Sequence, residues 1–350
     1  MDSKIERKLK DRNRKYFIEL ENYFRNLIVN NYEVRQNIAW KRNYSSVEAY
    51  KKSIESNKNR WESVLNPPKL EVINEIKFEP YNLLPDVNSW WIQIPLKGGL
   101  SAEGIFSLPE KKSDNLPNLV IAQHGILSTP EHTFGIGDDT GAYHAYSKAL
   151  LDAGFAVLAP FNLAMSENRN RIQRMATLIG TTLPGLEFAR LQHLLDKIIN
   201  NGKVKSNNIG MWGISLGGLA TQFWMPLEPR IKVGICTAWF NKRLYKMVIP
   251  DPRYSCFLPL KEEHIFISGW LTEFTDSDLI SLICPRPYMI QTGKADDIGW
   301  WPMIQDEYKK AKEHYEKMDI SERICMDLHN GGHEIRITTG IDWLKKWLSK

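Results

Sequence analysis

The hydrophobic and polar positions of the first 65 residues predict helices. Apolar side chains recur at helical spacing over residues 5–30, and a second helical pattern covers residues 45–64, where Ser45 or Ser46 is a favoured N-cap. An Asn-Pro-Pro sequence follows and ends the pattern, because proline cannot continue a helix. We therefore expect an N-terminal helical extension over residues 1–66.

Residues 67–350 have the pattern of an α/β domain. Three short alternating segments, at 70–78, 89–95 and 100–108, predict antiparallel strands. Continuous apolar runs then alternate with helical patterns, which is typical of a mostly parallel sheet with helices on both faces. The strand candidates are 119–122, 155–159, 209–212, 232–235, 288–291 and 324–326, and the helix candidates are about 141–153, 186–200, 216–224, 302–317 and 338–348.

Residues 240–282 interrupt this alternation. They show little regular periodicity but carry several aromatic side chains, among them Phe240, Tyr254, Phe257 and Trp270. A long irregular stretch inside a compact domain is usually functional. We predict that this segment forms a lid within the domain of residues 67–350.

Composition and charge exclude several classes of protein. Of the 350 residues 43% are hydrophobic and 25% charged, as in ordinary globular proteins, and the net charge is only +5. The densest basic run, in the first fifteen residues, is interleaved with acidic residues and predicts the solvated face of an amphipathic helix. No aromatic-rich basic module accompanies it, so we expect no nucleic-acid partner.

Cysteine usage and hydropathy indicate the compartment. The four cysteines are widely spaced and form no disulfide framework, so reduced and mostly buried thiols are expected. The sequence has no signal-like N-terminal stretch and no run of about 18 apolar residues that could span a bilayer. We therefore expect a cytoplasmic protein without a membrane partner.

The strongest chemical signal is Gly213-Ile214-Ser215-Leu216-Gly217-Gly218, which lies between a predicted strand and a predicted helix. In this context G-x-S-x-G forms a sharp turn that holds the serine in a strained conformation and projects it above the sheet. Side chains two residues before and after the serine would collide, which accounts for the two glycines. Ser215 is therefore the candidate nucleophile.

A serine hydroxyl needs a base, and the base needs an orienting carboxylate. The loop after strand 288–291 carries Asp296 and Asp297, and the loop after strand 324–326 carries His329 and His333. We favour His333, because the glycine pair before it allows a tight turn over the sheet edge. We favour Asp296 as the acid, with Asp297 as the second choice.

Other residues complete the predicted site. An oxyanion hole needs two backbone N–H groups, which we assign to Leu216, directly after the nucleophile, and to Ile126, after Gly125. His124 is expected to be a hydrogen-bonded structural histidine. Trp300 and Trp301 fit a substrate pocket and core packing equally well. No metal site is expected, because a Gly-Gly pair separates His329 from His333 and precludes a helical chelate.

These motifs, in this order, resemble the α/β-hydrolase superfamily, and more narrowly its dienelactone hydrolase and acetyl xylan esterase-like branch. The resemblance covers roughly residues 70–348. It rests on His124-Gly125, Gly213-x-Ser215-x-Gly217-Gly218, Gly293-x-x-Asp296 and Gly332-His333, with support from Pro229-Arg230-Ile231-Lys232 and Cys284-Pro285-Arg286-Pro287. Dienelactone hydrolases commonly have cysteine at the nucleophile position. Ser215 at this position favours the acetyl xylan esterase-like members of the branch.

The resemblance implies a serine-dependent carboxylic ester hydrolase that works through an acyl-enzyme, without a cofactor, on small acyl esters, with acetylated carbohydrates among the candidates. Ser215, Asp296 and His333 would form the triad. Two alternatives stay open: a serine peptidase of the prolyl oligopeptidase type, and a non-catalytic ligand-binding protein on a hydrolase scaffold. The sequence leaves the natural acyl group, the oligomeric state and the role of residues 1–66 undetermined.

Overall fold

A single mixed sheet organises the domain in the computed structural model, which describes residues 3–110 and 115–349. Within these ranges the sheet has nine strands in the order β1-β2-β3-β5-β4-β6-β7-β8-β9. The first three strands and the β3–β5 pair are antiparallel, and β5, β4 and β6 to β9 run parallel. The strands are β1 (Lys77–Pro80), β2 (Ser89–Leu96), β3 (Leu100–Ser107), β4 (Leu119–Gln123), β5 (Ala156–Pro160), β6 (Ile209–Ile214), β7 (Ile231–Thr237), β8 (Tyr288–Gly293) and β9 (Ile324–His329).

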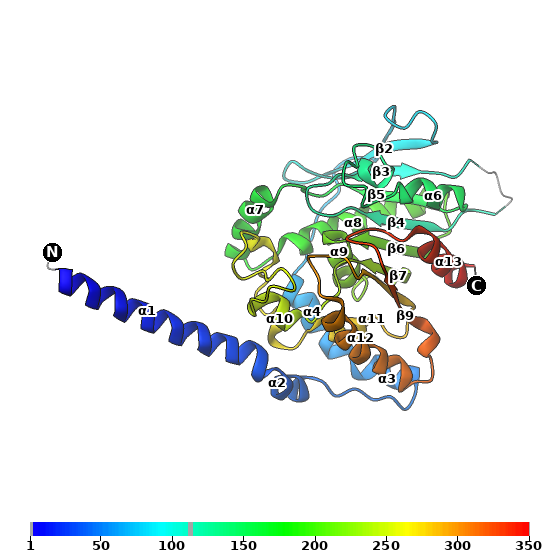
Figure 1. Ribbon diagram of the computed structural model, residues 1–350. Coiled ribbons are helices and arrows are strands. Elements are labelled where there is room, and N and C mark those ends of the chain that lie inside the picture. Colours follow the sequence, from blue (N-terminus) through cyan, green and yellow to red (C-terminus); the bar gives the residue numbers. More distant parts are fainter. Residues whose placement is uncertain (1–2, 111–114, 350) are drawn as a thin grey trace.

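Helices cover both faces of the sheet (Figure 1). One core lies between the sheet and α8 (Leu183–Asn200), α9 (Leu216–Trp224), α11 (Asp276–Ile283) and α12 (Trp301–Glu316). The other lies beneath α6 (Tyr146–Asp152) and α13 (Ile337–Leu348). The described residues also form the α-helices α5 (Pro130–Thr133), α7 (Ser166–Leu178) and α10 (Arg243–Val248). The predicted α/β class and its mostly parallel sheet are confirmed.

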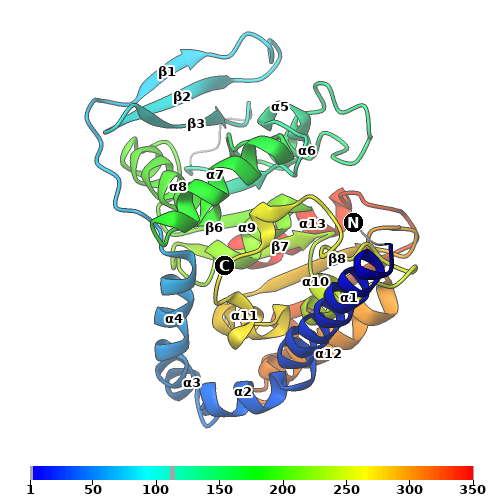
Figure 2. The ribbon, with the colours of Figure 1, turned by 90° about the vertical axis from the view of Figure 1, so that its left-hand side faces the viewer.

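The described residues of the predicted N-terminal extension form α1 (Ser3–Arg25), a π-helical turn (Asn26–Asn30), α2 (Tyr32–Ala39), α3 (Val47–Ser53) and α4 (Glu55–Leu65). Ser46 is the N-cap of α3 and accepts a hydrogen bond from the Ala49 N–H at 3.0 Å. In Figure 2, α2 to α4 follow one side of the domain, whereas α1 projects from it in Figure 1.

Helix α4 joins the extension to the domain through Trp61. This side chain is fully buried, and its indole Nε1 donates a hydrogen bond of 2.9 Å to the Phe223 carbonyl in α9. Its ring also packs edge-to-face on Phe223 and meets Phe274 at 5.2 Å. The extension therefore contributes to the core that supports the helix after Ser215.

The structure corrects several predicted boundaries. Residues 70–78 form a strand only from Lys77 onward, with a single bridge between Val72 and Leu96 before it. The predicted helix 141–153 begins at Tyr146, because Ala145 has a left-handed backbone that a helix interior excludes. Helices α2 and α7 escaped prediction, since both are largely polar and lack a clear apolar period.

The segment 240–282 is more regular than its sequence suggests. It contains α10, two single 3₁₀ turns and α11. Helix α11 begins with a capping box in which Thr275 and Asp278 exchange hydrogen bonds with backbone amides. That the segment moves as a lid stays a prediction.

None of the helices in residues 3–110 and 115–349 combines the length and apolarity needed to cross a bilayer. All four cysteines are free thiols, and Cys236, Cys256 and Cys284 are buried.

Candidate active site

Ser215 occupies the turn between β6 and α9, with a backbone φ of 56°. A Cβ at Gly213 would lie 2.0 Å from the Gly217 carbonyl oxygen, and a Cβ at Gly217 would lie 2.2 Å from the Gln123 carbonyl oxygen. Neither position has room for a side chain. The close packing expected of the two motif glycines is therefore present.

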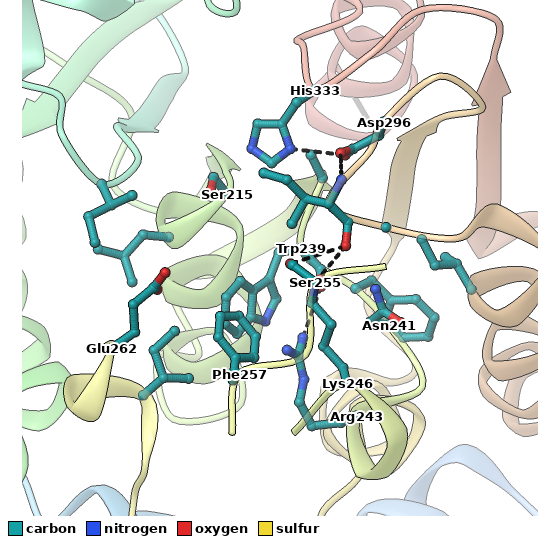
Figure 3. Close-up of a pocket in the computed structure, with 18 of the residues that line it drawn as sticks. Ser215, Trp239, Asn241, Arg243, Lys246, Ser255, Phe257, Glu262, Asp296 and His333 are labelled. Atoms are coloured by element: carbon teal, nitrogen blue, oxygen red, sulfur yellow. Dashed lines mark hydrogen bonds and ion pairs between the residues drawn. The ribbon is translucent and has the colours of Figure 1, made fainter. Parts of the chain in front are cut away.

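Asp296 and His333 meet above the carboxyl ends of β8 and β9. His333 Nδ1 and Asp296 Oδ2 are 2.9 Å apart, and the other Asp296 carboxylate oxygen accepts the Ile298 N–H at 3.0 Å (Figure 3). The Asp296 side chain is only 4% exposed, compared with 24% for His333. This arrangement lets Nδ1 of His333 donate to Asp296, so that Nε2 is left to accept a proton.

Backbone contacts hold the acid loop against the histidine loop. The Lys294 N–H donates to the His329 carbonyl at 2.8 Å, and the Ala295 N–H donates to the Gly331 carbonyl at 3.0 Å. A Cβ at Gly293 would lie 2.2 Å from the Gly331 carbonyl oxygen, so this close approach requires glycine. The Gly-x-x-Asp spacing thus reflects the packing of one loop on the other.

Ser215, Asp296 and His333 all line one cavity of about 260 Å³. Figure 3 shows Ser215 and His333 bordering the same space. Within the described residues, no hydrogen bond joins the Ser215 and His333 side chains. Such contacts are often long before a substrate binds.

The two residues expected to form the oxyanion hole, Leu216 and Ile126, also line this cavity. Leu216 is the first residue of α9, where backbone N–H groups point out of the helix end. The loop before Ile126 runs close to the nucleophile, since a Cβ at Gly125 would lie 3.3 Å from the Ser215 Cβ. Both main-chain segments therefore border the serine.

His124 has the environment of a structural histidine. Its ring is buried, with Nδ1 2.8 Å from the Gly125 carbonyl oxygen, while Nε2 accepts the Asn162 N–H at 3.2 Å. Burial lowers the pKa of His124 to about 4. The ring is thus a neutral bridge between two loops, as expected.

The second-choice residues lie apart from the cavity. Asp297 is exposed, and the buried His329 accepts the Gly331 N–H on its Nδ1 at 3.1 Å. Neither residue lines the cavity.

Trp300 and Trp301 do not line the cavity either, which corrects the pocket interpretation. Trp300 packs beneath the Arg253 guanidinium at 3.8 Å and beside a small cluster that contains Tyr254. Trp301 begins α12.

The cavity wall comes largely from residues after β7, which the sequence did not identify individually. Figure 3 shows Arg243 and Lys246 of α10 on one side and Glu262 on the other, with Trp239 between them, and His264 also lines the cavity. A lid predicted at 240–282 was the available signal. The lid prediction did not identify which residues line the cavity, because side-chain direction in an irregular segment depends on tertiary packing.

Several buried polar atoms on this wall lack a hydrogen-bond partner in the described structure. The donors are Trp239 Nε1 and Arg243 Nη1, Thr292 Oγ1 can donate or accept, and His264 Nε2 is left as an acceptor. His264 Nδ1 contacts Asn170 Oδ1 at 2.9 Å, and burial lowers the pKa of His264 to about 3, so the ring is neutral. Buried polar groups cost free energy unless water or a ligand satisfies them.

Arg243 is fixed in place by its partners. It is fully buried, and its Nε and Nη2 donate to the two carboxylate oxygens of Asp276 at 3.0 and 2.8 Å. The guanidinium also stacks 4.1 Å from the centre of the Trp239 ring. Only Nη1 is left without a partner.

Lys246 and Glu262 are partly desolvated charges on the same wall. Burial, assisted by repulsion from Arg243, lowers the pKa of Lys246 to about 7, and burial raises the pKa of Glu262. Lys246 Nζ donates to Ser255 Oγ at 2.5 Å and to the Ile298 carbonyl at 2.6 Å. The described residues contain no group of three His, Cys, Asp or Glu side chains arranged to hold a metal ion.

Comparison with solved structures identifies the architecture. A structure described as a putative acetyl xylan esterase from Bacteroides fragilis aligns with a TM-score of 0.63 and 15% identity, over 82% of this chain and 77% of that chain. A carbohydrate esterase family 15 glucuronoyl esterase from Caldicellulosiruptor kristjansonii aligns with a TM-score of 0.59 and 17% identity, over 86% of each chain. The chain has the α/β-hydrolase fold.

Comparison of sequences gives fewer matches than comparison of structures. No family model matches the chain. The protein named "Putative hydrolase YtaP" from Bacillus subtilis (strain 168) is 25% identical over 213 residues, which are 58% of this chain and 68% of that protein. The resemblance inferred from the motifs is therefore confirmed at the level of the fold, with esterases among the structural neighbours.

The buried amine of Lys246 makes a testable contribution to stability. Its pKa in the folded protein, about 7, lies below its ordinary value of 10.5, so the unfolded chain binds more protons between these two values. The free energy of unfolding should therefore rise with pH in this window, by up to about 1.4 kcal/mol per pH unit from this group. Urea denaturation of the wild type and of Lys246→Met from pH 7 to 9.5 measures the difference.

The exposed variant Lys309→Met is the matched control for replacing a lysine by methionine. A difference between the wild type and Lys246→Met that does not change over this pH range would contradict the depressed pKa.

Proposed function

We propose that the protein is a serine-dependent carboxylic ester hydrolase that acts on small acyl esters through an acyl-enzyme. The observation that carries the proposal is the His333–Asp296 hydrogen bond of 2.9 Å at the edge of the cavity that Ser215 also lines. Esterases among the structural neighbours support it. A complete set of catalytic parts favours catalysis over a ligand-binding role on the same scaffold.

In the proposed first step, the Ser215 hydroxyl oxygen attacks the ester carbonyl carbon while Nε2 of His333 takes the hydroxyl proton. The imidazolium so formed is stabilised by Asp296, which is held by the Ile298 N–H. The tetrahedral intermediate collapses when His333 passes this proton to the leaving alcohol. Water then attacks the acyl-enzyme by the same route, with His333 as base, and releases the acid and free Ser215.

The oxygen of the tetrahedral intermediate needs donors that are already in place. We assign the N–H groups of Leu216 and Ile126 to this role, because both residues line the cavity beside the serine. Donors fixed in the main chain need no reorganisation when charge develops, and one such donor is typically worth about 3 kcal/mol in the transition state.

The cavity favours a small acyl ester with a hydroxylated alcohol, for which an acetylated carbohydrate is the model. Its volume of about 260 Å³ is small for a ligand pocket. Its wall carries unpartnered donors on Trp239 and Arg243 and an unpartnered acceptor on His264. These atoms are buried, so a ligand contacts them only after the wall side chains move. Sugar hydroxyl groups both donate and accept, so they can then satisfy both kinds of atom, whereas an alkyl chain satisfies neither.

Covalent labelling tests the nucleophile. A fluorophosphonate probe should modify the wild type at one site and leave Ser215→Ala unlabelled, because the probe reacts with an activated serine. Labelling is read by intact mass spectrometry on folded protein. Equal labelling of both proteins would remove Ser215 from this role.

Substitution of the two aspartates tests the acid. Asp296→Asn should lower kcat for an aryl acetate by about ten thousandfold, since the amide no longer stabilises the imidazolium or fixes its tautomer. Asp297→Asn should stay close to wild type, because Asp297 is exposed and lies outside the cavity. The reverse order of effects would transfer the role to Asp297.

A pair of acetate esters tests the alcohol. Trp239→Phe removes one N–H donor and keeps the ring, so kcat/KM for an acetylated methyl xyloside should fall about three- to tenfold, the value of one neutral hydrogen bond. Butyl acetate has the same acyl group, and its kcat/KM should change little. An equal loss for both esters would argue against hydroxyl recognition by this wall.

A further inference from the structure

Helix α1 presents an apolar stripe that no other described part of the chain covers. Phe17, Leu20 and Phe24 are 63%, 40% and 57% exposed, and the stripe continues towards the N-terminus through Leu9 and Ile5. In Figure 1 the helix projects away from the domain. Its charged side is solvated, as the sequence predicted, but the opposite side is solvated as well.

Such a surface is unusual for an isolated chain. Exposed contiguous apolar surface on a soluble protein generally marks an interaction site, and a helix gains most of its stability by packing its apolar face. The stripe follows helical spacing from Tyr16 through Leu20 to Phe24, and Asn13 separates this part from Leu9 and Ile5. A long binding partner that follows the helix axis would bury it.

A groove lies at the base of the same helix. It has a volume of about 650 Å³ and a mostly apolar lining, to which Phe24 and Ile28 contribute from the N-terminal segment and Val248 and Phe266 from the domain. The Arg25 side chain bridges the two parts by donating to the Val248 carbonyl at 2.9 Å. The stripe thus runs directly into a concave apolar site.

The distribution of charge along α1 favours antiparallel over parallel packing of two copies of this helix. Residues 4–15 hold seven Lys or Arg and two acidic residues, whereas residues 16–25 hold Glu19, Glu21 and Arg25. Two copies of the helix packed in parallel would place the basic halves together. Antiparallel packing places each basic half beside the half that carries the two glutamates.

We propose that two copies of this chain form a symmetric dimer in which their α1 helices pack antiparallel. A twofold axis between Tyr16 and Phe17 sets Leu9 of one copy opposite Phe24 of the other. The same register brings Ile5 to the level of Ile28, so the tip of each helix fills the groove at the base of the other. A twofold axis makes this surface self-complementary and closes the assembly at two chains.

The same register pairs opposite charges on both sides of the stripe. Arg12 and Glu19 are two helical turns apart and share one side, and Arg14 and Glu21 share the other. In the antiparallel pair Arg12 faces Glu19 of the second copy, and Arg14 faces Glu21 of the second copy. Within one chain Glu19 lies 3.7 Å from Lys15, a contact between exposed side chains that leaves it able to accept a second partner.

A second copy fits better than an anionic membrane surface, the other partner that a basic amphipathic helix suggests. The two glutamates flank the stripe and would face the lipid headgroups. The groove at the helix base is open and mostly apolar, and the tip of a second helix can cover it.

Sedimentation velocity of the full chain at about 1–100 µM tests the proposal, and the wild type should run as a dimer. Leu20→Asp should raise the dissociation constant about a hundredfold or more, since the symmetric interface loses two buried leucines. Ile18→Asp, on the opposite side of α1, is the matched control and should leave the dimer intact. A wild-type monomer, or equal effects of Leu20→Asp and Ile18→Asp, would overturn the proposal.

Charge reversal tests the register. Arg12→Glu and Glu19→Arg should each weaken the dimer by placing like charges opposite one another, and the double variant should recover most of the loss. Circular dichroism checks that each variant keeps its helix content. Failure of the double variant to recover, with helix content unchanged, would contradict the antiparallel register.

A vesicle experiment separates the two partners. The wild type is sedimented with phosphatidylserine–phosphatidylcholine vesicles and, as a control, with pure phosphatidylcholine vesicles. A dimer that stays in the supernatant supports the proposal. A monomer that binds the anionic vesicles through the Leu20 face would overturn the proposal and identify a membrane as the partner of α1.

Discussion

The turn at Ser215 is the constraint on which the site depends. Gly213 and Gly217 approach neighbouring main chain so closely that a methyl group at either position would overlap a carbonyl oxygen. This packing forces the left-handed backbone of Ser215 and aims its side chain out of the sheet edge. It also brings α9 and the loop after β4 together, so both proposed oxyanion donors border the serine. The same backbone turn therefore positions the proposed nucleophile and the proposed oxyanion-hole donors.

A second close approach of main chain, at Gly293, positions the proposed base His333 beside Asp296. The acid loop and the histidine loop touch through main chain, and this contact sets Asp296 beside His333 before any substrate arrives. The segment after β7 then closes the cavity with a wall of mixed polar and apolar side chains. Helix α10 borders two separate hollows. Arg243 and Lys246 line the cavity beside Ser215, and Val248 lines the groove at the base of α1. One short helix thus shapes the cavity and also lines the groove used in the proposed assembly through α1.

The parts that the sequence predicted are those with local signals. Continuous apolar runs located β4 to β9, and G-x-S-x-G between a strand and a helix located the turn at Ser215. The loops after the predicted strands 288–291 and 324–326 then offered Asp296 and His333. The sequence did not locate the side chains that shape the cavity, because Arg243 and His264 reach it through buried contacts with Asp276 and Asn170 that are distant in sequence. For Trp300 and Trp301 the sequence left pocket lining and core packing equally open, because adjacency to Asp296 along the chain does not fix side-chain direction, and neither residue lines the cavity.

The central claim is that Ser215, His333, Asp296 and two main-chain amides act on one reacting group. A crystal structure of the protein after reaction with diethyl p-nitrophenyl phosphate tests this most directly. The account predicts a phosphorus–oxygen bond to Ser215 Oγ, with the phosphoryl oxygen within hydrogen-bond distance of the Leu216 and Ile126 N–H groups and His333 beside an ester oxygen. Phosphorylation of a different side chain, or a phosphoryl oxygen directed away from both amides, would contradict it.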